Sequence, residues 1–282
     1  MPEFAEVEFF RKRWHQAAAG QRITAVLVHP AAKVFRGTKP NAIRRALTRT
    51  KFLSSEAQAK QMLFRFSAAG SRSSEPTSWL GIHLGMSGEL SVAPADYVPG
   101  KHDHLVLRTG HHSLVFNDPR MFGRVQFHHG ATAPAWWTRI APPILSPKFT
   151  VAAVAAFLKR RARAPIKAVL LMQERFPGIG NWMADEILWR AAIHPKRAAG
   201  SLKPAEVRAL WRECRRVCRL ALNTIAGRGD ILPPDLNVHI PRTWLFRHRW
   251  SAKGRDPLTG TPLARATIGG RTTSWSPARQ KL

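Results

Sequence analysis

Hydrophobic and polar residues alternate over short distances in the first half of this chain. Apolar or alternating runs recur between Ile23 and Phe127, and short runs of this kind are typical of β-strands. Turn residues separate the runs at Gly37, Gly70, Pro99–Gly100 and Thr109–Gly110. The pattern predicts strands at residues 23–28, 33–35, 61–66, 79–83, 89–92, 104–108, 113–117 and 123–127. Many short strands separated by turns indicate a β-sandwich.

Helical spacing of apolar residues flanks this strand-rich region. An amphipathic helix is predicted from Ala5 to about Ala19, and further helices at residues 151–161, 165–175, 181–192 and 204–226. The stretch ATAPAWWTRIAPPILSP is rich in proline and lacks periodicity, which is typical of a linker. We therefore expect an α+β fold. Its parts are an N-terminal helix and β-sandwich domain at residues 1–135, a linker at 136–147, a helical domain at 148–240 and a C-terminal segment at 241–282.

The stretch from Pro165 to Pro195 is predicted to form two helices joined by a glycine turn. Gly178 and Gly180 can adopt the positive φ angles that close the first helix, and Asn181 offers an N-cap oxygen for the second. Backbone N–H groups at the start of that second helix could hold a phosphate. The alternative interpretation is an ordinary helix-turn-helix packing element.

The charge of the chain favours the phosphate interpretation. Its 282 residues include 45 Lys and Arg against 17 Asp and Glu, a formal net charge of +28, so nucleic acid is the leading partner over an anionic membrane. The sequence has no run of about 18 apolar residues and no signal-peptide pattern, which predicts a soluble protein of the cytoplasm or nucleoid. The two cysteines, Cys214 and Cys218, have the spacing of neither a zinc finger nor a disulfide framework.

The N-terminus carries a candidate nucleophile. Pro2 is small enough to permit removal of Met1, which would expose a secondary amine with a pKa of about 8 that can attack an electrophilic carbon. Glu3 and Glu6 flank this amine in the sequence. The alternative is an inert terminus, as in most chains that begin Met-Pro-Glu.

Three stretches resemble the formamidopyrimidine-DNA glycosylase and endonuclease VIII (Fpg/Nei) family of base-excision repair enzymes. GIGNWMADEILWRAAIHP resembles the family's helix-two-turn-helix motif, and MPEFAEVE resembles its MPELPEVE opening, in which the freed proline is the nucleophile. The ending TIGGRTTSWSPARQKL is similar to that of the plant and fungal Fpg-type enzymes. One departure is Ala5, where the family has a second proline. The resemblance implies a monomer that binds duplex DNA containing a damaged base or an abasic site.

The resemblance also implies roles for residues of the N-terminal region. Pro2 would attack C1′ of a flipped nucleotide, Glu3 would shuttle protons, and Glu6 would support the sugar and the amine. Lys60 matches a strand lysine that holds the lesion's phosphate and assists the chemistry. The pattern HLGMSG places His83 near backbone phosphates. Without the family, Lys60 would be interpreted as a solvated charge at a sheet edge.

Three further residues are implied to fill the gap that a flipped nucleotide leaves in the duplex. Met86 in HLGMSG and Phe122 in NDPRMFG match wedges that enter the duplex, and Arg120 matches the contact to the orphaned base. Without the family, Met86 would be interpreted as core packing and Asp118–Pro119 as a simple turn.

The C-terminal region is implied to hold phosphates and to end in a finger without zinc. Gly178, Gly180 and Asn181 belong to the helix-two-turn-helix phosphate seat. Arg271 matches a fingertip arginine that grips phosphates around the flipped nucleotide. Many family members bind zinc here through four cysteines, whose positions correspond to Asp256, Thr259, Ser276 and Arg279. Residues 241–282 are therefore predicted to be a zincless β-hairpin finger, and no metal or other cofactor is expected.

Over the whole chain, the resemblance implies a bifunctional DNA glycosylase and AP lyase. It would remove oxidised or ring-opened bases through a Schiff base on Pro2, followed by β- and δ-elimination. The plant-type ending leads us to expect ring-opened purines, hydantoins and abasic sites as substrates in preference to 8-oxoguanine. Two other hypotheses stay open: a non-catalytic DNA-binding protein of the same fold, and a basic RNA-binding module, on which the three duplex-filling residues would have no role.

Overall fold

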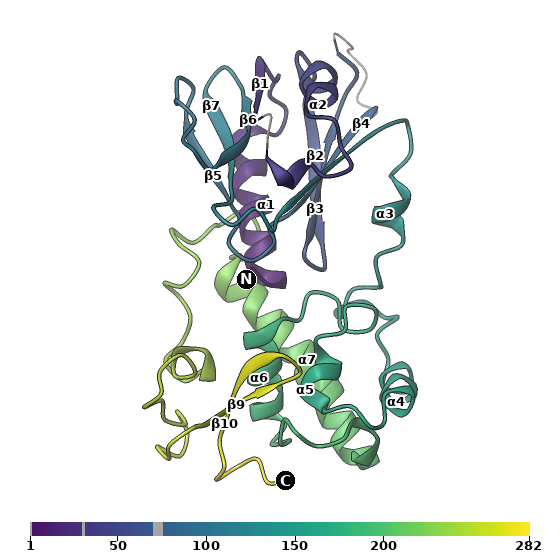
Figure 1. Cartoon of the computed structure of the whole chain (residues 1–282), viewed down its shortest axis with the longest axis vertical. Coiled ribbons are helices and arrows are strands. Elements are labelled where there is room, and N and C mark those ends of the chain that lie inside the picture. Colours follow the sequence, from purple (N-terminus) through teal and green to yellow (C-terminus); the bar gives the residue numbers. More distant parts are fainter. Residues whose placement is uncertain (1, 30–31, 70–75) are drawn as a thin grey trace. The chain divides into compact units, whose positions relative to one another are not determined.

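The computed structural model describes residues 2–29, 32–69 and 76–282 (Figure 1). The predicted turn at Gly70 lies outside these ranges. The chain divides into two compact units, Met1–Ile140 with Ala226–Leu232 and Ala141–Ile225 with Pro233–Leu282. This boundary falls inside the predicted linker. The first unit is rich in strands and the second in helices, which confirms the predicted α+β fold.

Two four-stranded antiparallel sheets form the β-sandwich of the N-terminal unit. Their strand orders are β1-β6-β7-β5 and β2-β3-β4-β8. The strands are β1 (Ala25–Val28), β2 (Phe52–Gln58), β3 (Gln61–Phe66), β4 (Ser78–His83), β5 (Glu89–Pro94), β6 (Asp103–Arg108), β7 (His112–Asn117) and β8 (Arg124–His129). Leu105 and Leu107 of β6 are fully buried at alternate positions, as expected for a strand with one face in the core.

Helix α1 (Phe4–Ala18) packs on both sheets. Trp14 is fully buried, and its ring lies 5.1 Å from the ring of Phe64 in β3. Its indole N–H donates to the carbonyl of Ser91 in β5 at 2.9 Å. These contacts fix the helix whose first turn carries the predicted catalytic residues.

One predicted strand of this unit is wrong, and three elements, one of them in the predicted linker, were not predicted. Residues 33–35 form a 3₁₀ turn, η1 (Lys33–Phe35), in which the consecutive residues Val34 and Phe35 are both buried. In a strand these two side chains would point to opposite faces. Helix α2 (Pro40–Leu47) was not predicted because it is short and buries only Ile43 and Leu47. Strand β2 was not predicted because it is largely polar, and Phe52 is its only fully buried residue.

The first part of the predicted linker belongs to the N-terminal unit. Helix α3 (Ala135–Thr138) places the buried Trp137 against Trp79 of β4. The neighbouring Trp136 lies over Gly81, where an added Cβ would be 2.3 Å from the indole ring. The contacts of these two tryptophans attach the segment to the sheet that contains β4.

The C-terminal unit is built around a helix that is buried on all sides. Every residue from Trp182 to Trp189 of α6 is buried, which is typical of a central core helix. The other elements are α4 (Val151–Arg160), α5 (Ile166–Leu170), α6 (Asn181–Arg190), η2 (Ala199–Ser201), α7 (Pro204–Ile225), η3 (Leu245–Arg247) and the hairpin β9 (Ala264–Ile268) with β10 (Arg271–Trp275). Helices α4 and α7 follow the predicted ranges closely.

Candidate active site

The first turn of α1 carries two carboxylates, Glu3 and Glu6, and directly follows Pro2, which is half-buried. Glu3 is the N-cap residue. Its side chain accepts the N–H of Glu6, and Glu6 Oε2 accepts the N–H of Glu3 at 3.1 Å. This reciprocal capping box follows from the spacing Glu-x-x-Glu. Ala5 is fully buried in the same turn, so the turn is closed without a second proline.

Lys60 and His83 lie at adjacent ends of two paired strands. Lys60 follows Ala59, which has a φ of 56° in the β2–β3 turn, and its neighbour Gln61 pairs with His83. The side chain of Lys60 is buried, so it is not the solvated edge charge of the alternative interpretation. The structure therefore brings Lys60 and His83 together.

Burial and nearby cations favour the neutral form of the His83 ring. Its pKa is lowered first by burial and then by the charges of Lys60, Arg36 and Arg124. Its Nδ1 accepts the N–H of Gly85 at 3.0 Å, which leaves the proton of the neutral ring on Nε2. At neutral pH, His83 is thus an N–H donor in a positively charged region, and such a region attracts phosphate.

Met86, Arg120 and Phe122 lie on two loops of this unit. The Met86 loop (residues 84–88) follows β4, and the Arg120 loop (residues 118–123) joins β7 to β8. Phe122 is 50% exposed, and the guanidinium of Arg120 lies 4.9 Å from the centre of its ring. Met86 is half-buried. An exposed aromatic ring beside a cation presents a surface on which bases can stack.

Asp118 joins these two loops, although the sequence identified it only as a turn residue. Its fully buried carboxylate accepts the Ser87 hydroxyl and the Gly123 N–H, each at 2.7 Å. An added Cβ on Gly85 would lie 2.4 Å from the carbonyl carbon of Phe122, so the two loops touch through their backbones. Ser87 and Asp118 are 31 residues apart, and no spacing rule connects them.

The turn before α6 differs from the prediction by one residue. Gly178 has the expected positive φ, 87°. Gly180, in contrast, has a φ of −124° and is the N-cap of α6, so Asn181 is the first helical residue and not the cap. The predictions of a positive φ at Gly180 and an N-cap at Asn181 were therefore wrong. Glycine is itself an acceptable N-cap residue, and the sequence alone could not decide between the two neighbours.

The first helix of this pair is also shorter than predicted. It ends at Leu170 because the side chain of Gln173 takes over the turn that follows. Gln173 Oε1 accepts the N–H of Gly178 at 3.0 Å, and its Nε2 donates to the carbonyl of Ile179 at 2.9 Å. The turn that carries Gly178 and Gly180 is therefore held by a side chain that sequence analysis did not single out.

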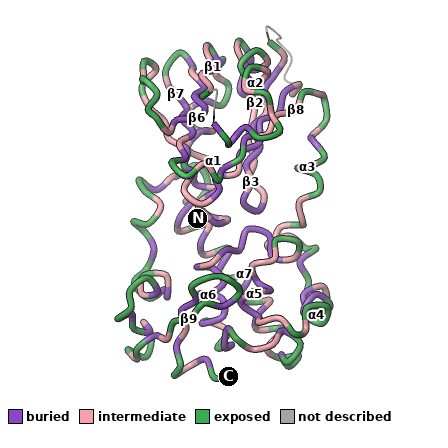
Figure 2. The backbone as a smooth tube through the Cα atoms, viewed as in Figure 1, coloured by how far each residue is buried: buried purple, intermediate pink, exposed green. Residues whose placement is uncertain are grey.

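Asn181 and Arg271 lie near each other in the C-terminal unit. Asn181 Nδ2 donates to the carbonyl of Thr272 at 2.9 Å, and Thr272 directly follows Arg271 at the start of β10. Arg271 is exposed beside Gly269 and Gly270, whose φ values of 60° and 72° form the tip of the hairpin. Figure 2 shows this tip as an exposed segment. The helix start and the hairpin tip thus contribute to one surface.

A buried ion cluster ties α6 to the hairpin. The fully buried Asp185 pairs with the fully buried Lys167 and with Arg249, whose Nη2 lies 2.7 Å from Asp185 Oδ2. Lys167 also donates to the carbonyl of Asn181 at 2.6 Å, and Asp185 Oδ2 accepts the N–H of Ser274 at 3.1 Å. The cluster was not predicted, because the cations are 18 and 64 residues from Asp185.

Comparison with known proteins identifies the family of this chain. The formamidopyrimidine-DNA glycosylase N-terminal domain matches residues 1–125, and the formamidopyrimidine-DNA glycosylase H2TH domain matches residues 140–230. The formamidopyrimidine-DNA glycosylase of Geobacter sulfurreducens is 35% identical over 100% of both chains. The chain belongs to the formamidopyrimidine-DNA glycosylase family.

Other relatives of this family come from bacteria and plants. The formamidopyrimidine-DNA glycosylase of Roseiflexus is 39% identical over 72% of this chain and 74% of that protein, and that of Arabidopsis thaliana is 27% identical over 100% of this chain and 71% of that protein. The Lactococcus lactis Fpg in complex with DNA containing an oxidised pyrimidine has a TM-score of 0.84 at 22% identity, with 100% of both chains covered. This likeness shows the fold. Placement in the plant and fungal branch stays a prediction.

The positions of the family's zinc ligands form a hydrogen-bonded centre in this chain. The buried Asp256 accepts the N–H of Leu258 at 2.8 Å and the indole N–H of Trp189 at 3.2 Å. Burial raises the pKa of Asp256, but hydrogen bonds to its carboxylate outweigh this effect, so the pKa lies below its usual value. The guanidinium of Arg279 lies 5.3 Å from the Trp189 ring. This set of residues does not fit the nitrogen and sulfur ligands of structural zinc.

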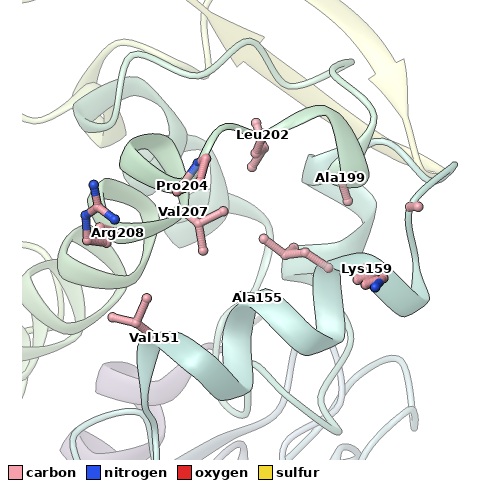
Figure 3. A pocket seen from close by; sticks show the side chains of 11 residues that line it. Val151, Ala155, Lys159, Ala199, Leu202, Pro204, Val207 and Arg208 are labelled. Atoms are coloured by element: carbon pink, nitrogen blue, oxygen red, sulfur yellow. The ribbon is translucent and has the colours of Figure 1, made fainter.

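Further features of the described chain concern metal binding, membrane insertion and cavities. Within residues 2–29, 32–69 and 76–282, no group of three or more His, Cys, Asp or Glu could hold a metal ion. No helix in these ranges is long and apolar enough to cross a membrane. A cavity of about 440 Å³ between α4, η2 and α7 is lined by small apolar side chains with Lys159 and Arg208 (Figure 3). None of the site residues predicted from the sequence lines this cavity.

Proposed function

We propose that this protein is a bifunctional DNA glycosylase and AP lyase of base excision repair that removes oxidised or ring-opened bases from duplex DNA. One observation carries the proposal: the capping box of α1 holds the carboxylates of Glu3 and Glu6 beside Pro2. Groups fixed in this way react without first losing their freedom of motion, which is a large part of many enzymatic rate gains. Membership of the family supports the same chemistry.

Pro2 becomes the nucleophile once Met1, which lies outside the described residues, has been removed. The unprotonated amine forms a bond to C1′ of the flipped nucleotide, and the base leaves with the electrons of the glycosidic bond and takes a proton from water. The nitrogen of Pro2 then passes its own proton to the carboxylate of Glu3. Glu3 then delivers a proton to O4′ as the sugar ring opens, which leaves an iminium ion on Pro2. Glu6 supports the sugar and orients the amine through its bond to the Glu3 N–H.

The iminium ion makes strand cleavage accessible. Withdrawal of electrons towards the positively charged nitrogen acidifies the C2′ hydrogen, so a base can remove this proton as the 3′-phosphate leaves in β-elimination. The same electron withdrawal then allows loss of the 5′-phosphate by δ-elimination. Water then hydrolyses the Schiff base and releases the amine of Pro2.

Phosphate binding is assigned to residues of both units. In the N-terminal unit, Lys60 and the neutral His83 offer an ammonium group and an Nε2–H donor. In the C-terminal unit, Asn181 and Arg271 contribute side chains, while Gly178 and Gly180 let the backbone approach closely. The formal net charge of +28 attracts the polyanion over a longer range.

Met86, Arg120 and Phe122 are assigned to the gap left by the flipped nucleotide. Extrusion of a base costs a few kcal/mol of stacking and pairing, and inserted side chains offset part of this cost. The cation–π contact of Arg120 with Phe122 keeps the guanidinium at the loop tip, where it can meet the orphaned base.

The substrate is duplex DNA with a damaged base or an abasic site, and no cofactor is required. Relatives of known structure from Lactococcus lactis are bound to DNA that contains an oxidised pyrimidine, a Fapy-dG or an abasic site. For this chain we propose ring-opened purines, hydantoins and abasic sites, acted on by a monomer in the cytoplasm or nucleoid.

Borohydride reduction tests the proposed chemistry. Purified protein, with loss of Met1 verified by mass, is expected to form a covalent adduct with duplexes carrying an abasic site or an oxidised base. The variant Pro2→Glu, whose large second residue retains Met1, is expected to lose the adduct while its salt-sensitive DNA binding persists. Tight binding with no adduct from the native sequence on any duplex would instead support the non-catalytic hypothesis.

A binding comparison tests the flipping model separately. Arg120→Ala is expected to weaken binding to a lesion-bearing duplex about tenfold, because the orphaned base loses a charged partner, with little effect on undamaged duplex or RNA. Equal losses on all three nucleic acids would contradict a role for Arg120 in the gap.

A further inference from the structure

The side chain of Asp118 accepts three hydrogen bonds from two loops. It is fully buried, and its Oδ1 accepts the Ser87 hydroxyl at 2.7 Å and the Arg120 N–H at 3.3 Å. Its Oδ2 accepts the Gly123 N–H at 2.7 Å. Two of these donors belong to the Arg120 loop and one belongs to the Met86 loop. The carboxylate of Asp118 therefore connects the Met86 loop to the Arg120 loop.

The backbone of Asp118 is fixed as firmly as its side chain. Its N–H donates to the carbonyl of His102 at 3.0 Å, and its carbonyl accepts the Nε2–H of the buried His104 at 2.9 Å. The carboxylate is thus attached to the body of the sandwich through β6. Any group bonded to it takes its position from the sandwich and not from a mobile loop.

A second contact closes the interface between the loops. Gly85, with a φ of +64°, leaves no space for a side chain, since an added Cβ would lie 2.5 Å from the Gly123 nitrogen. The carbonyl of Phe122, which also lies next to Gly85, accepts Arg36 Nη2 at 3.2 Å. Backbone-to-backbone packing of this kind transmits a displacement of one loop directly to the other.

We propose that Asp118 and Ser87 are positioning residues that form a latch, through which Met86, Arg120 and Phe122 enter the duplex as one preorganised unit. The inference rests on the proposed function, in which these three side chains fill the gap. A preordered loop pair loses less conformational freedom on binding than two independent loops would. The latch accordingly speeds gap filling without touching the substrate.

The placement of donors around both side-chain oxygens explains why residue 118 is an aspartate and not an asparagine. Its two oxygens accept three hydrogen bonds, whereas an asparagine side chain has one oxygen and would present an N–H₂ group to one set of donors. A simple turn residue would need only the bonds within residues 118–123. The hydrogen bond from Ser87 is the one that a turn over residues 118–123 does not require.

Ser87→Ala is the decisive variant because it removes the bond between the loops and leaves both bonds within the Arg120 loop intact. Ser113→Ala is the control: Ser113 lies in β7 of the same sandwich and is fully buried, whereas Ser87 is half-buried, and the Ser113 hydroxyl donates to the carbonyl of Ala95 at 3.2 Å. Both variants remove one hydroxyl from the same unit, so they separate the latch from general loss of stability.

Gap filling is measured without chemistry by stopped-flow fluorescence. The probe is a duplex with a tetrahydrofuran abasic analogue beside 2-aminopurine, whose emission reports unstacking. Ser87→Ala is expected to slow the fluorescence change about tenfold, the loss typical of a hydrogen bond to a charged group, while Ser113→Ala stays within about twofold of the native protein. Equal rates for all three proteins would overturn the latch.

Double-mutant cycles measure the coupling between Met86 and Phe122, which would not change if Ser87 only stabilised the fold. Met86→Ala and Phe122→Ala are combined in the native background and in the Ser87→Ala background. We expect the two effects on the fluorescence rate to be coupled with Ser87 present and additive without it. Coupling that is unchanged in Ser87→Ala would overturn the proposal.

The chemical and the fluorescence measurements fail independently. Borohydride trapping on a single-stranded abasic oligonucleotide, where no gap has to be filled, is expected to be the same for the native protein and Ser87→Ala. Native protein that traps nothing, yet shows coupled gap filling, would remove the proposed catalysis and keep the latch. Normal borohydride trapping with uncoupled gap filling would keep the proposed catalysis and remove the latch.

Discussion

Two fully buried aspartates, one in each unit, hold together segments that are far apart in the sequence, and they do so with different charge balance. Asp118 bonds to a hydroxyl and to backbone N–H groups, so its neighbours are uncharged donors. Asp185 pairs with two buried cations, Lys167 and Arg249. The first arrangement positions side chains that are proposed to enter the duplex, and the second fixes a helix start against a hairpin.

This difference in partners indicates that the stability of the Asp185 site depends on charge and that of the Asp118 site does not. A buried ion pair is only weakly stabilising as a whole, but removal of one partner leaves an uncompensated charge in a medium of low polarity. Among the residues that the structure describes, Asp118 forms no ion pair, so its loss leaves polar donors unsatisfied and no bare cation. Substitution by the neutral amide should therefore separate the two aspartates.

Asp185→Asn is expected to have the largest effect. Lys167 and Arg249 would stay buried without a counter-charge, and the free energy of unfolding should fall by about 3 to 5 kcal/mol. Urea unfolding followed by circular dichroism measures this change. Asp96→Asn, at an exposed position, is the matched control and should change the free energy by less than about 0.5 kcal/mol. A small loss for Asp185→Asn would show that the cluster does not hold the finger.

Glu186, next to Asp185, gives an intermediate case with one cation. Burial raises its pKa from 4.5 to about 6, against the opposing effects of Arg190 and of the N–H groups of Phe246 and Leu245. A raised pKa in the folded state means that this group stabilises the fold below about pH 4.5 and that the contribution is lost as the pH rises through about 6.

The rise in the pKa of Glu186 from 4.5 to about 6 corresponds to about 2 kcal/mol in the free energy of unfolding. Between about pH 4.5 and pH 7, the native protein should therefore lose about 2 kcal/mol of stability relative to Glu186→Gln, which has no titrating group at this position. Unfolding measured across this range checks the difference, and parallel pH profiles for the two proteins would count against it.

Asp118→Asn is expected to cost less than Asp185→Asn, about 1 to 2 kcal/mol, because its donors are neutral and one oxygen remains to accept a hydrogen bond. The same urea experiment provides the comparison. If Asp118→Asn proved as damaging as Asp185→Asn, the number of buried cations would not be what distinguishes the two sites.

Chelation is expected to have no effect. Asp256, Thr259, Ser276 and Arg279 do not form a zinc site, and Asp256 is engaged by N–H donors. Prolonged treatment with EDTA and 1,10-phenanthroline should leave both the melting temperature and the trapping rate unchanged. Loss of either, with recovery on addition of zinc, would overturn the zincless assignment.

The elements that could be predicted from sequence are those with local patterns. Strand β3 matches its predicted range because its apolar residues are buried against the core, whereas the polar β2 carries little signal of its own. The capping box of Glu3 and Glu6 is likewise encoded by a spacing of three. Local rules failed by one residue at Gly180, where two neighbouring residue types are both good caps.

The interactions that could not be predicted are long-range. Ser87 meets Asp118, and Lys167 meets Asp185, through the packing of elements that no periodicity connects. Single polar residues in a sequence do not indicate their partners, since side-chain hydrogen bonds depend on where the backbone brings them. The candidate site was predicted as separate motifs, and the structure added the groups that position them.

The location of the borohydride adduct tests the central claim most directly. The protein trapped on an abasic duplex is digested, and the modified peptide is sequenced by mass spectrometry. We predict a reduced sugar on the nitrogen of Pro2 in the N-terminal peptide, with Met1 absent. An adduct on the side chain of Lys60, or on any other lysine, would contradict the assignment of Pro2 as the nucleophile.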